Sequence, residues 1–121
     1  MYILSIETMI SAAHRLREYD GNCVRIHGHN WKIRVEVKTD TLNELGMGID
    51  FKELTDLSWQ VVGRFDHQEI NSIPPFDTMN PTAENLARYF YQEIGKLLPP
   101  PIRMHKISLW ETDKYMVEYS E

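Results

Sequence analysis

The sequence is poor in cysteine, and it has no long apolar run. Its single cysteine, Cys23, cannot close an internal disulfide, which favours a reducing compartment. No segment approaches the roughly 20 apolar residues that span a bilayer. The N-terminal residues lack a basic head followed by a long apolar stretch, so they do not read as a signal peptide. We therefore expect a cytoplasmic protein without a membrane segment.

Positive charge is scarce as well. The 13 Lys and Arg residues are outnumbered by 18 Asp and Glu residues, for a net charge of −5 at pH 7. General affinity for nucleic acid needs a basic surface, so this balance argues against a nucleic-acid partner. A small anionic substrate stays open, because a local cluster can override the net charge. Arg15, Arg17 and Arg25 lie near a His-rich segment, but each is equally well explained as a solvated loop arginine.

Internal repeats and low-complexity tracts are also missing. The chain has 121 residues, 42% of them hydrophobic and 26% charged, which is ordinary for a globular protein. This length fits one compact domain, so we expect residues 1–121 to form a single unit. The three prolines at 99–101 read as a stiff connector, because too little chain follows them to form a second core.

Alternation of apolar and polar residues predicts four strands. The clearest case is residues 29–38, where from position 31 onward every second residue is apolar and those between are charged. A looser alternation covers residues 2–14. Two shorter segments, 103–111 and 115–119, are typical of closing strands.

Two segments between these strands predict helices. From Asp50 to about Phe65 apolar residues recur with helical spacing, Asp50 can cap the helix, and Glu53 sits where a capping box places its acid. A second helix starts near Thr82, with either Asn80 or Thr82 as its cap. The side chains expected to face the core are Phe51, Leu54, Leu57, Val61, Phe65, Leu86, Phe90, Ile94 and Leu97.

The order strand, strand, helix, helix, strand, strand predicts an α+β fold. In this layout two helices cover one face of a four-stranded antiparallel sheet. Such a sheet has two edges, and a small domain either blunts its edges or pairs them with copies of itself. We therefore expect the protein to form oligomers.

Three histidines share the parity of the apolar face. His27 and His29 are two residues apart, so both imidazoles leave the same side of the backbone if the strand begins by His27. His14 falls on the apolar face of the first strand by the same count. Buried imidazoles without partners are costly, and a divalent metal such as zinc relieves that cost. Three ligands leave a fourth position open, as in catalytic sites; the alternative is core histidines satisfied by hydrogen bonds.

Cys23, Asp66 and His67 are candidates for acid–base chemistry. A thiol near a cation ionises more easily, so Cys23 could act as a base, but it could also be a fourth metal ligand or an inert apolar residue. A carboxylate beside an imidazole can orient it and raise its basicity, which suits Asp66 and His67 for general acid–base catalysis. The alternative for this pair is a solvated helix end.

Glu111 breaks the pattern of the strand that carries it. It shares the parity of Ile107 and Leu109, so it should point to the apolar side at the strand end. A ligand with paired N–H donors, such as a guanine-like or pterin-like ring, would satisfy both carboxylate oxygens. A strand-end glutamate turned to water is the alternative.

Six motifs together carry a resemblance to a known family. They occur in the order SAAHRL, CVRIHGHNW, GIDFKEL, FDHQEIN, NPTAENLA and WET. With them the chain resembles the 6-pyruvoyl-tetrahydropterin synthase superfamily, most closely its bacterial branch, the 6-carboxytetrahydropterin synthases. The CxxxHGH spacing is similar to that of the carboxy-forming enzymes, because the pyruvoyl-forming enzymes have a longer gap. Cys23 argues against a folate-linked branch, which has a glutamate in its place.

The resemblance implies a role for each candidate residue and an assembly. The three histidines would bind zinc, and Cys23 would perform acid–base work with the pair Asp66 and His67. Glu111 would anchor a pterin ring. The implied fold is a T-fold, in which three subunits close a β-barrel and two trimers stack into a homohexamer with active sites between subunits.

The resemblance also implies a reaction. The protein would be a zinc-dependent lyase that converts 7,8-dihydroneopterin triphosphate to 6-carboxy-5,6,7,8-tetrahydropterin and releases triphosphate and acetaldehyde, a step towards queuosine. One alternative is elimination of triphosphate to 6-pyruvoyl-tetrahydropterin. The other is a non-catalytic, zinc-stabilised binding module with Cys23 as the fourth ligand.

Overall fold

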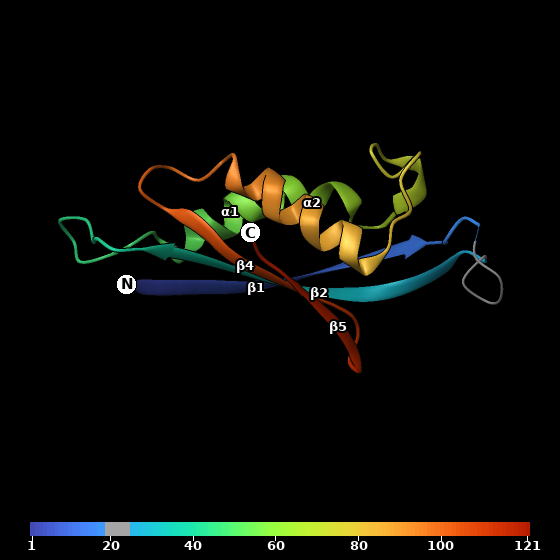
Figure 1. The fold of residues 1–121 in the computed structure, drawn as a ribbon, viewed down its shortest axis with the longest axis horizontal. Helices are drawn as coiled ribbons and strands as arrows, with labels where there is room; N and C mark the ends of the chain where they lie inside the picture. Colours follow the sequence, from blue (N-terminus) through green and yellow to red (C-terminus); the bar gives the residue numbers. More distant parts are fainter. Residues whose placement is uncertain (19–24) are drawn as a thin grey trace.

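The structure, a computed structural model, describes residues 1–18 and 25–121. Within these residues a twisted sheet carries two α-helices, both on the same face (Figure 1). In chain order the elements are β1 (Tyr2–His14), β2 (His27–Thr39), α1 (Phe51–Val62), η2 (Gly63–Phe65), β3 (Gln68–Glu69), η3 (Ile70–Ser72), α2 (Ala83–Gly95), β4 (Arg103–Thr112) and β5 (Tyr115–Tyr119). The predicted α+β fold, with two helices on one face of the sheet, is confirmed.

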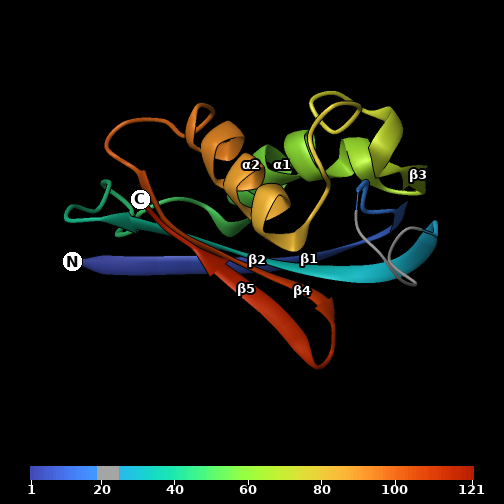
Figure 2. The same cartoon turned by 45° about the vertical axis from the view of Figure 1, so that its right-hand side comes forward.

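One strand, β3, was not predicted. The order across the sheet is β3-β1-β2-β4-β5, and β3 pairs in parallel with Ala12 and Ala13 at the outer edge of β1 (Figure 2). The other strand pairs are antiparallel, as predicted. Because a strand of two residues shows no alternation, the sequence pattern gives no sign of it. The described sheet therefore has five strands instead of four.

The ladder between β1 and β2 positions the histidines. It runs without interruption from Tyr2 opposite Thr39 to His14 opposite His27. Side chains of directly opposed residues lie on the same face of a sheet, so His14 and His27 are neighbours at the end of the ladder. Because β2 begins at His27, the side chains of His27 and His29 leave the same side of the strand, as predicted.

The core lies between the sheet and the two helices. Most of the helix residues predicted to face it are buried: Leu54, Val61, Phe65, Leu86, Phe90 and Ile94. Phe51 and Leu97 were expected there too, but they are 57% and 38% exposed. Phe51 is the first residue of α1 and Leu97 lies beyond the end of α2, so the helical spacing overestimated the length of both apolar stripes.

The two helix caps follow the expected chemistry. Asp50 accepts a hydrogen bond from the Lys52 backbone N–H at 2.8 Å, which confirms it as the cap of α1. Thr82 Oγ1 accepts from the Asn85 N–H at 3.1 Å, so Thr82 rather than Asn80 caps α2. No helix in the described ranges is long and apolar enough to cross a membrane.

Candidate metal centre

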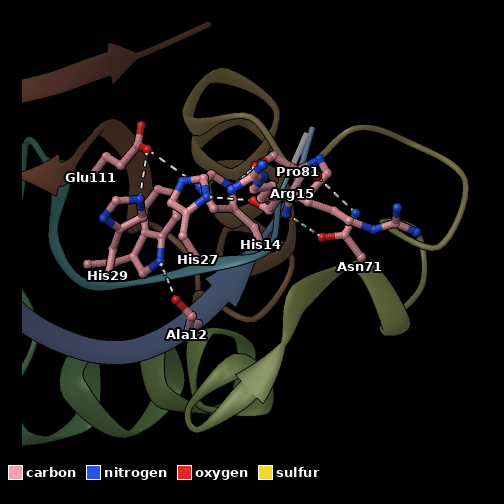
Figure 3. Close-up of polar contacts among 10 residues, drawn as sticks. Ala12, His14, Arg15, His27, His29, Asn71, Pro81 and Glu111 are labelled. Atoms are coloured by element: carbon pink, nitrogen blue, oxygen red, sulfur yellow. Dashed lines mark hydrogen bonds and ion pairs between the residues drawn. The ribbon is translucent and has the colours of Figure 1, made fainter. Parts of the chain in front are cut away.

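Three imidazoles meet where β1 ends and β2 begins. The ring centroids of His14 and His27 are 4.8 Å apart, those of His27 and His29 4.7 Å, and those of His14 and His29 5.3 Å. Figure 3 shows the three rings side by side, with Glu111 above them. One potential ligand atom from each of these four residues lies within 4.8 Å of all the others. The predicted convergence of the histidines is confirmed.

Backbone carbonyls fix the orientation of two of these rings. His14 Nδ1 lies 2.8 Å from the Pro81 carbonyl oxygen, and His27 Nδ1 lies 2.9 Å from that of Arg25. A carbonyl only accepts, so each Nδ1 carries the proton and donates. Each Nε2 then presents a lone pair, which is the tautomer that a metal-binding histidine needs.

The inward nitrogens have no hydrogen-bond partner among the described residues. The Nε2 atoms of both His14 and His29 are buried and unsatisfied. An unsatisfied buried polar group costs about 1–3 kcal/mol, so two such atoms side by side need an explanation. A divalent cation bound by nitrogen ligands provides one, and the chemistry of this donor set therefore fits a metal ion.

The electrostatics of the cluster also favour neutral imidazoles. Burial lowers the pKa of His29 below its usual value, and the neighbouring His14 and His27 lower it further, while Glu111 opposes the shift. Since a protonated imidazole has no lone pair to offer, a lowered pKa keeps His29 able to bind a metal near neutral pH.

Glu111 points to the face predicted from its parity, and it contacts the histidines. Its Oε1 lies 3.1 Å from His29 Nε2 and 3.4 Å from His14 Nε2. The side chain is 30% exposed, so the carboxylate is also open to the neighbouring pocket. The sequence pattern treated Glu111 as separate from the three histidines, whereas the structure brings all four together. Its role in substrate binding stays a prediction.

A pocket of about 390 Å³ opens beside the cluster. Its lining combines the ends of β1, β2 and β4 with the N-terminus of α2: His14, Leu16, Arg17, Glu18, His27, Asn80, Thr82, Ala83, Glu84 and Glu111. Both polar and apolar groups converge here, as in pockets that bind small molecules. Of the three arginines near the histidines, Arg17 lines this pocket, but its guanidinium donates to the backbone carbonyls of Asn71, Phe76 and Met79.

Asp66 and His67 follow η2 at the outer edge of β1. Asp66 Oδ1 accepts from the Ser11 N–H at 2.9 Å, and the His67 N–H donates to the Ser11 carbonyl at 2.6 Å. His67 has a positive φ of 57°, and its side chain is 80% exposed. Its Nε2 lies 3.7 Å from Asp66 Oδ2, beyond ordinary hydrogen-bond length. Their predicted acid–base role stays a prediction, since no hydrogen bond or ion pair among the described residues joins His67 to the cluster. Cys23 lies outside the described residues.

Two asparagines that the sequence did not flag hold the segment after His14. Asn71 is 6% exposed; its side chain accepts from the Arg15 N–H at 2.9 Å and donates to the Arg15 carbonyl at 3.0 Å. Asn80 repeats this pattern with Arg17, at 2.8 and 3.1 Å. Each side-chain amide thus makes the two backbone hydrogen bonds that a neighbouring strand would otherwise make. An asparagine directly after Ile70 in FDHQEIN was the only available signal, and it is a weak one.

The fold and the site define an α+β protein of the T-fold class with a candidate metal centre beside a pocket. The sequence matches the 6-pyruvoyl tetrahydropterin synthase family over residues 3–121. The chain belongs to this family, and the resemblance stated from its motifs is confirmed.

Curated relatives and solved structures agree on the family. A 6-carboxy-5,6,7,8-tetrahydropterin synthase of Synechocystis is 32% identical over 117 residues, which cover 93% of this chain and 88% of the relative. A dihydroneopterin monophosphate aldolase of Pyrococcus furiosus is also 32% identical, covering 88% and 87%. The solved 6-pyruvoyl tetrahydropterin synthase of Caenorhabditis elegans superposes with a TM-score of 0.85 at 26% identity, covering 100% of this chain and 97% of the other. The protein is thus a member of a family of tetrahydropterin synthases.

Proposed function

We propose that this protein is a zinc-dependent 6-carboxytetrahydropterin synthase. It would convert 7,8-dihydroneopterin triphosphate to 6-carboxy-5,6,7,8-tetrahydropterin with release of triphosphate and acetaldehyde, as a step towards queuosine. The observation that carries the proposal is the convergence of two unsatisfied buried imidazole nitrogens and a carboxylate beside an open pocket. The relative of the same name in Synechocystis supports the choice of reaction.

His14, His27 and His29 would hold the zinc ion through their Nε2 atoms. Once bound, the ion would act as a Lewis acid that lowers the pKa of hydroxyl groups on the substrate side chain. The carbonyls of Pro81 and Arg25 would support this chemistry, because they fix the tautomers of His14 and His27.

Three further residues would handle the substrate's protons. Cys23, as a thiolate, would remove a proton bonded to carbon. His67 would carry protons to and from the reacting oxygens, and Asp66 would orient it. Because the thiol must stay reduced for this role, the proposal includes a cytoplasmic location.

Glu111 would position the pterin ring. Its two carboxylate oxygens can accept the paired N–H donors that a pterin presents along one edge. Its place beside the histidines would bring the substrate side chain to the metal, which contributes orientation rather than chemistry.

The proposal includes a homohexamer of two stacked trimers, with active sites between subunits. Before Ser11, β1 has no partner on its outer edge in the described part of the chain, and β5 has a partner on one side. Apolar side chains are exposed along these two strands, namely Ile3, Met9, Tyr115 and Met116. Pairing of the two edges between subunits would cover them and close a barrel.

The decisive test is product analysis with 7,8-dihydroneopterin triphosphate and purified, zinc-loaded protein. The proposed reaction yields a 6-carboxyl group, triphosphate and acetaldehyde in equal amounts. Elimination to 6-pyruvoyl-tetrahydropterin would release triphosphate without acetaldehyde. The Pyrococcus furiosus relative favours an aldolase as a second candidate, and an aldolase would shorten the side chain without leaving a carboxyl group.

A variant of Cys23 separates catalysis from a purely structural metal site. Cys23→Ala should keep zinc and lose turnover, because the histidines hold the ion while the thiolate moves the proton. Full activity with stoichiometric zinc would rule out the assigned role. Loss of the zinc would instead support a non-catalytic module in which Cys23 is a ligand.

A further inference from the structure

Glu111 is placed between the histidine cluster and the open pocket. It belongs to the list of residues that line the pocket, and it also contacts the cluster. Figure 3 shows its carboxylate facing His29 and His14 at the same time. A substrate that enters the pocket would therefore meet this carboxylate next to the imidazoles.

The distances match those between neighbouring ligands of one ion. Zinc binds nitrogen and oxygen at about 2.0–2.2 Å, so adjacent ligands of a tetrahedral site lie about 3.3 Å apart. Glu111 Oε1 lies 3.1 Å from His29 Nε2 and 3.4 Å from His14 Nε2. The carboxylate oxygen thus lies at ligand-to-ligand distance from two of the three imidazoles, and within 4.8 Å of a ligand atom of the third.

Glu111 has no pairing partner in either ladder of β4. In the pairing of β4 with β5, Trp110 is opposite Met116 and Thr112 is opposite Tyr115, so Glu111 is the extra residue of a bulge. The pairing of β4 with β2 ends one residue earlier, at Trp110. β-Bulges next to binding sites commonly redirect a side chain, and neither ladder fixes this residue.

We infer that Glu111 exchanges between the metal and the substrate. In the absence of substrate it is the fourth ligand of the ion that the three histidines hold. When a pterin ring enters, its paired N–H donors bind both oxygens of Glu111, and the carboxylate leaves the metal. This inference rests on the proposed function, because it requires both the metal site and the pterin ring.

The exchange couples the acidity of the metal site to the presence of substrate. A carboxylate ligand neutralises one of the two positive charges of the ion, whereas neutral imidazoles neutralise none. When Glu111 turns to the ring, it vacates a coordination position and leaves the full charge to act on a substrate hydroxyl. Without substrate, the same carboxylate excludes water from that position.

The test uses the full-length protein loaded with Co²⁺, whose visible spectrum reports the ligands of the ion. The variants are Glu111→Ala and Glu111→Gln, and the matched control is Asp113→Asn, an exposed carboxylate in the same hairpin. The probe is pterin without a side chain, so that no side-chain hydroxyl can bind the metal. Circular dichroism checks that each variant is folded.

Both Glu111 variants should bind the metal at least about tenfold more weakly than the wild type, whereas Asp113→Asn should not. Addition of pterin should change the wild-type spectrum to resemble that of Glu111→Ala. Unchanged metal affinity and spectrum in both Glu111 variants would overturn the inference. So would a wild-type spectrum that stays constant when pterin binds, or a wild-type protein that does not bind pterin.

Failure of the exchange is distinguishable from failure of the proposed function. If the wild type binds no metal at the histidines, or forms no 6-carboxytetrahydropterin, the proposed function fails. If the wild type binds metal and forms this product while the Glu111 variants keep the wild-type spectrum, the exchange alone fails.

Discussion

The open face of the sheet and its helix-covered face both carry polar side chains. The two faces differ in how completely those side chains are paired with each other. On the open face, Arg34 Nη2 lies 2.7 Å from Glu7 Oε2, and Lys106 Nζ lies 2.6 Å from Glu118 Oε2. Lys32 Nζ lies 4.2 Å from the centre of the Trp110 ring. Charges on this face therefore find their partners on neighbouring strands.

On the helix-covered face the histidine cluster is less completely paired, although Glu111 Oε1 lies 3.1 Å from His29 Nε2. His14 and His29 share this face with apolar residues of the core, and their inward nitrogens lack hydrogen-bond partners in the described ranges. The Arg34–Glu7 and Lys106–Glu118 pairs need no ligand to be satisfied, whereas the two imidazole nitrogens do. Glu36 Oε2 on the open face is also buried without a hydrogen-bond partner, but it stands alone there and lies 3.6 Å from Lys106 Nζ. The two imidazole nitrogens lie side by side next to a pocket, so their clustering marks the candidate functional end of the sheet.

The largest expected effect is the loss of a metal ligand from β2, compared with a change on the other face of the same strand. His29→Ala should lose the metal and all activity, because it removes one of three nitrogen ligands. Arg34→Ala, five residues along β2 on the open face, should keep stoichiometric metal. Elemental analysis after dialysis measures both. Stoichiometric, tightly bound metal in the His29 variant would exclude the histidine cluster as the site.

The next largest effect is expected for Asn71, the asparagine that holds the segment after His14. Asn71→Ala leaves the N–H and carbonyl of Arg15 without their side-chain partners, which should cost about 1–3 kcal/mol of unfolding free energy. Because Arg15 follows His14 directly, metal affinity should also fall by about 10- to 100-fold. Urea unfolding and a metal-competition titration measure the two effects.

Asn43→Ala is the matched control for this variant. The Asn43 side chain accepts two backbone N–H groups, from Leu45 and Met47, in the loop after the far end of β2. It should therefore lower stability without weakening metal binding. Equal losses of metal affinity in both variants would show that Asn71 acts on overall stability and not on the position of His14.

A smaller effect is the dependence of stability on pH in the metal-free protein. The folded pKa of His29 lies below its usual value, chiefly because of burial, so the unfolded chain binds the proton first as pH falls. The stability should then be full above about pH 6.5 and decrease as the pH drops below it. Chemical unfolding between pH 8 and 5, with a chelator present, measures this slope. His29→Gln should flatten the slope; a slope that persists in this variant would assign it to another group.

The sequence predicted the parts of this fold that depend on local periodicity. Alternation along β2 and the shared parity of His14, His27 and His29 were sufficient to place three imidazoles together. The parity of Glu111 was sufficient to direct it to the same face. These inferences succeed because a strand has a fixed period of two, so the facing of each residue follows from its position.

Contacts between distant segments could not be predicted in the same way. His14 meets the carbonyl of Pro81, and Ser11 meets Asp66, across 67 and 55 positions of sequence. The bulge at Glu111 leaves no periodic signal, and neither does the two-residue β3. Such features depend on how loops return to the sheet, which only the tertiary structure defines.

The smallest expected effect belongs to the open face. The side chains of Glu7 and Arg34 are about half exposed, and solvent screens their attraction. A double-mutant cycle with Glu7→Gln and Arg34→Gln should give a coupling energy of only about 0.2–1 kcal/mol in urea unfolding. Metal content should stay unchanged in all three variants. A coupling well above this range would mean that solvent screens this pair less than its exposure indicates. A loss of metal would mean that the two faces depend on each other, because a pair on the open face would then be supporting the histidines across the sheet.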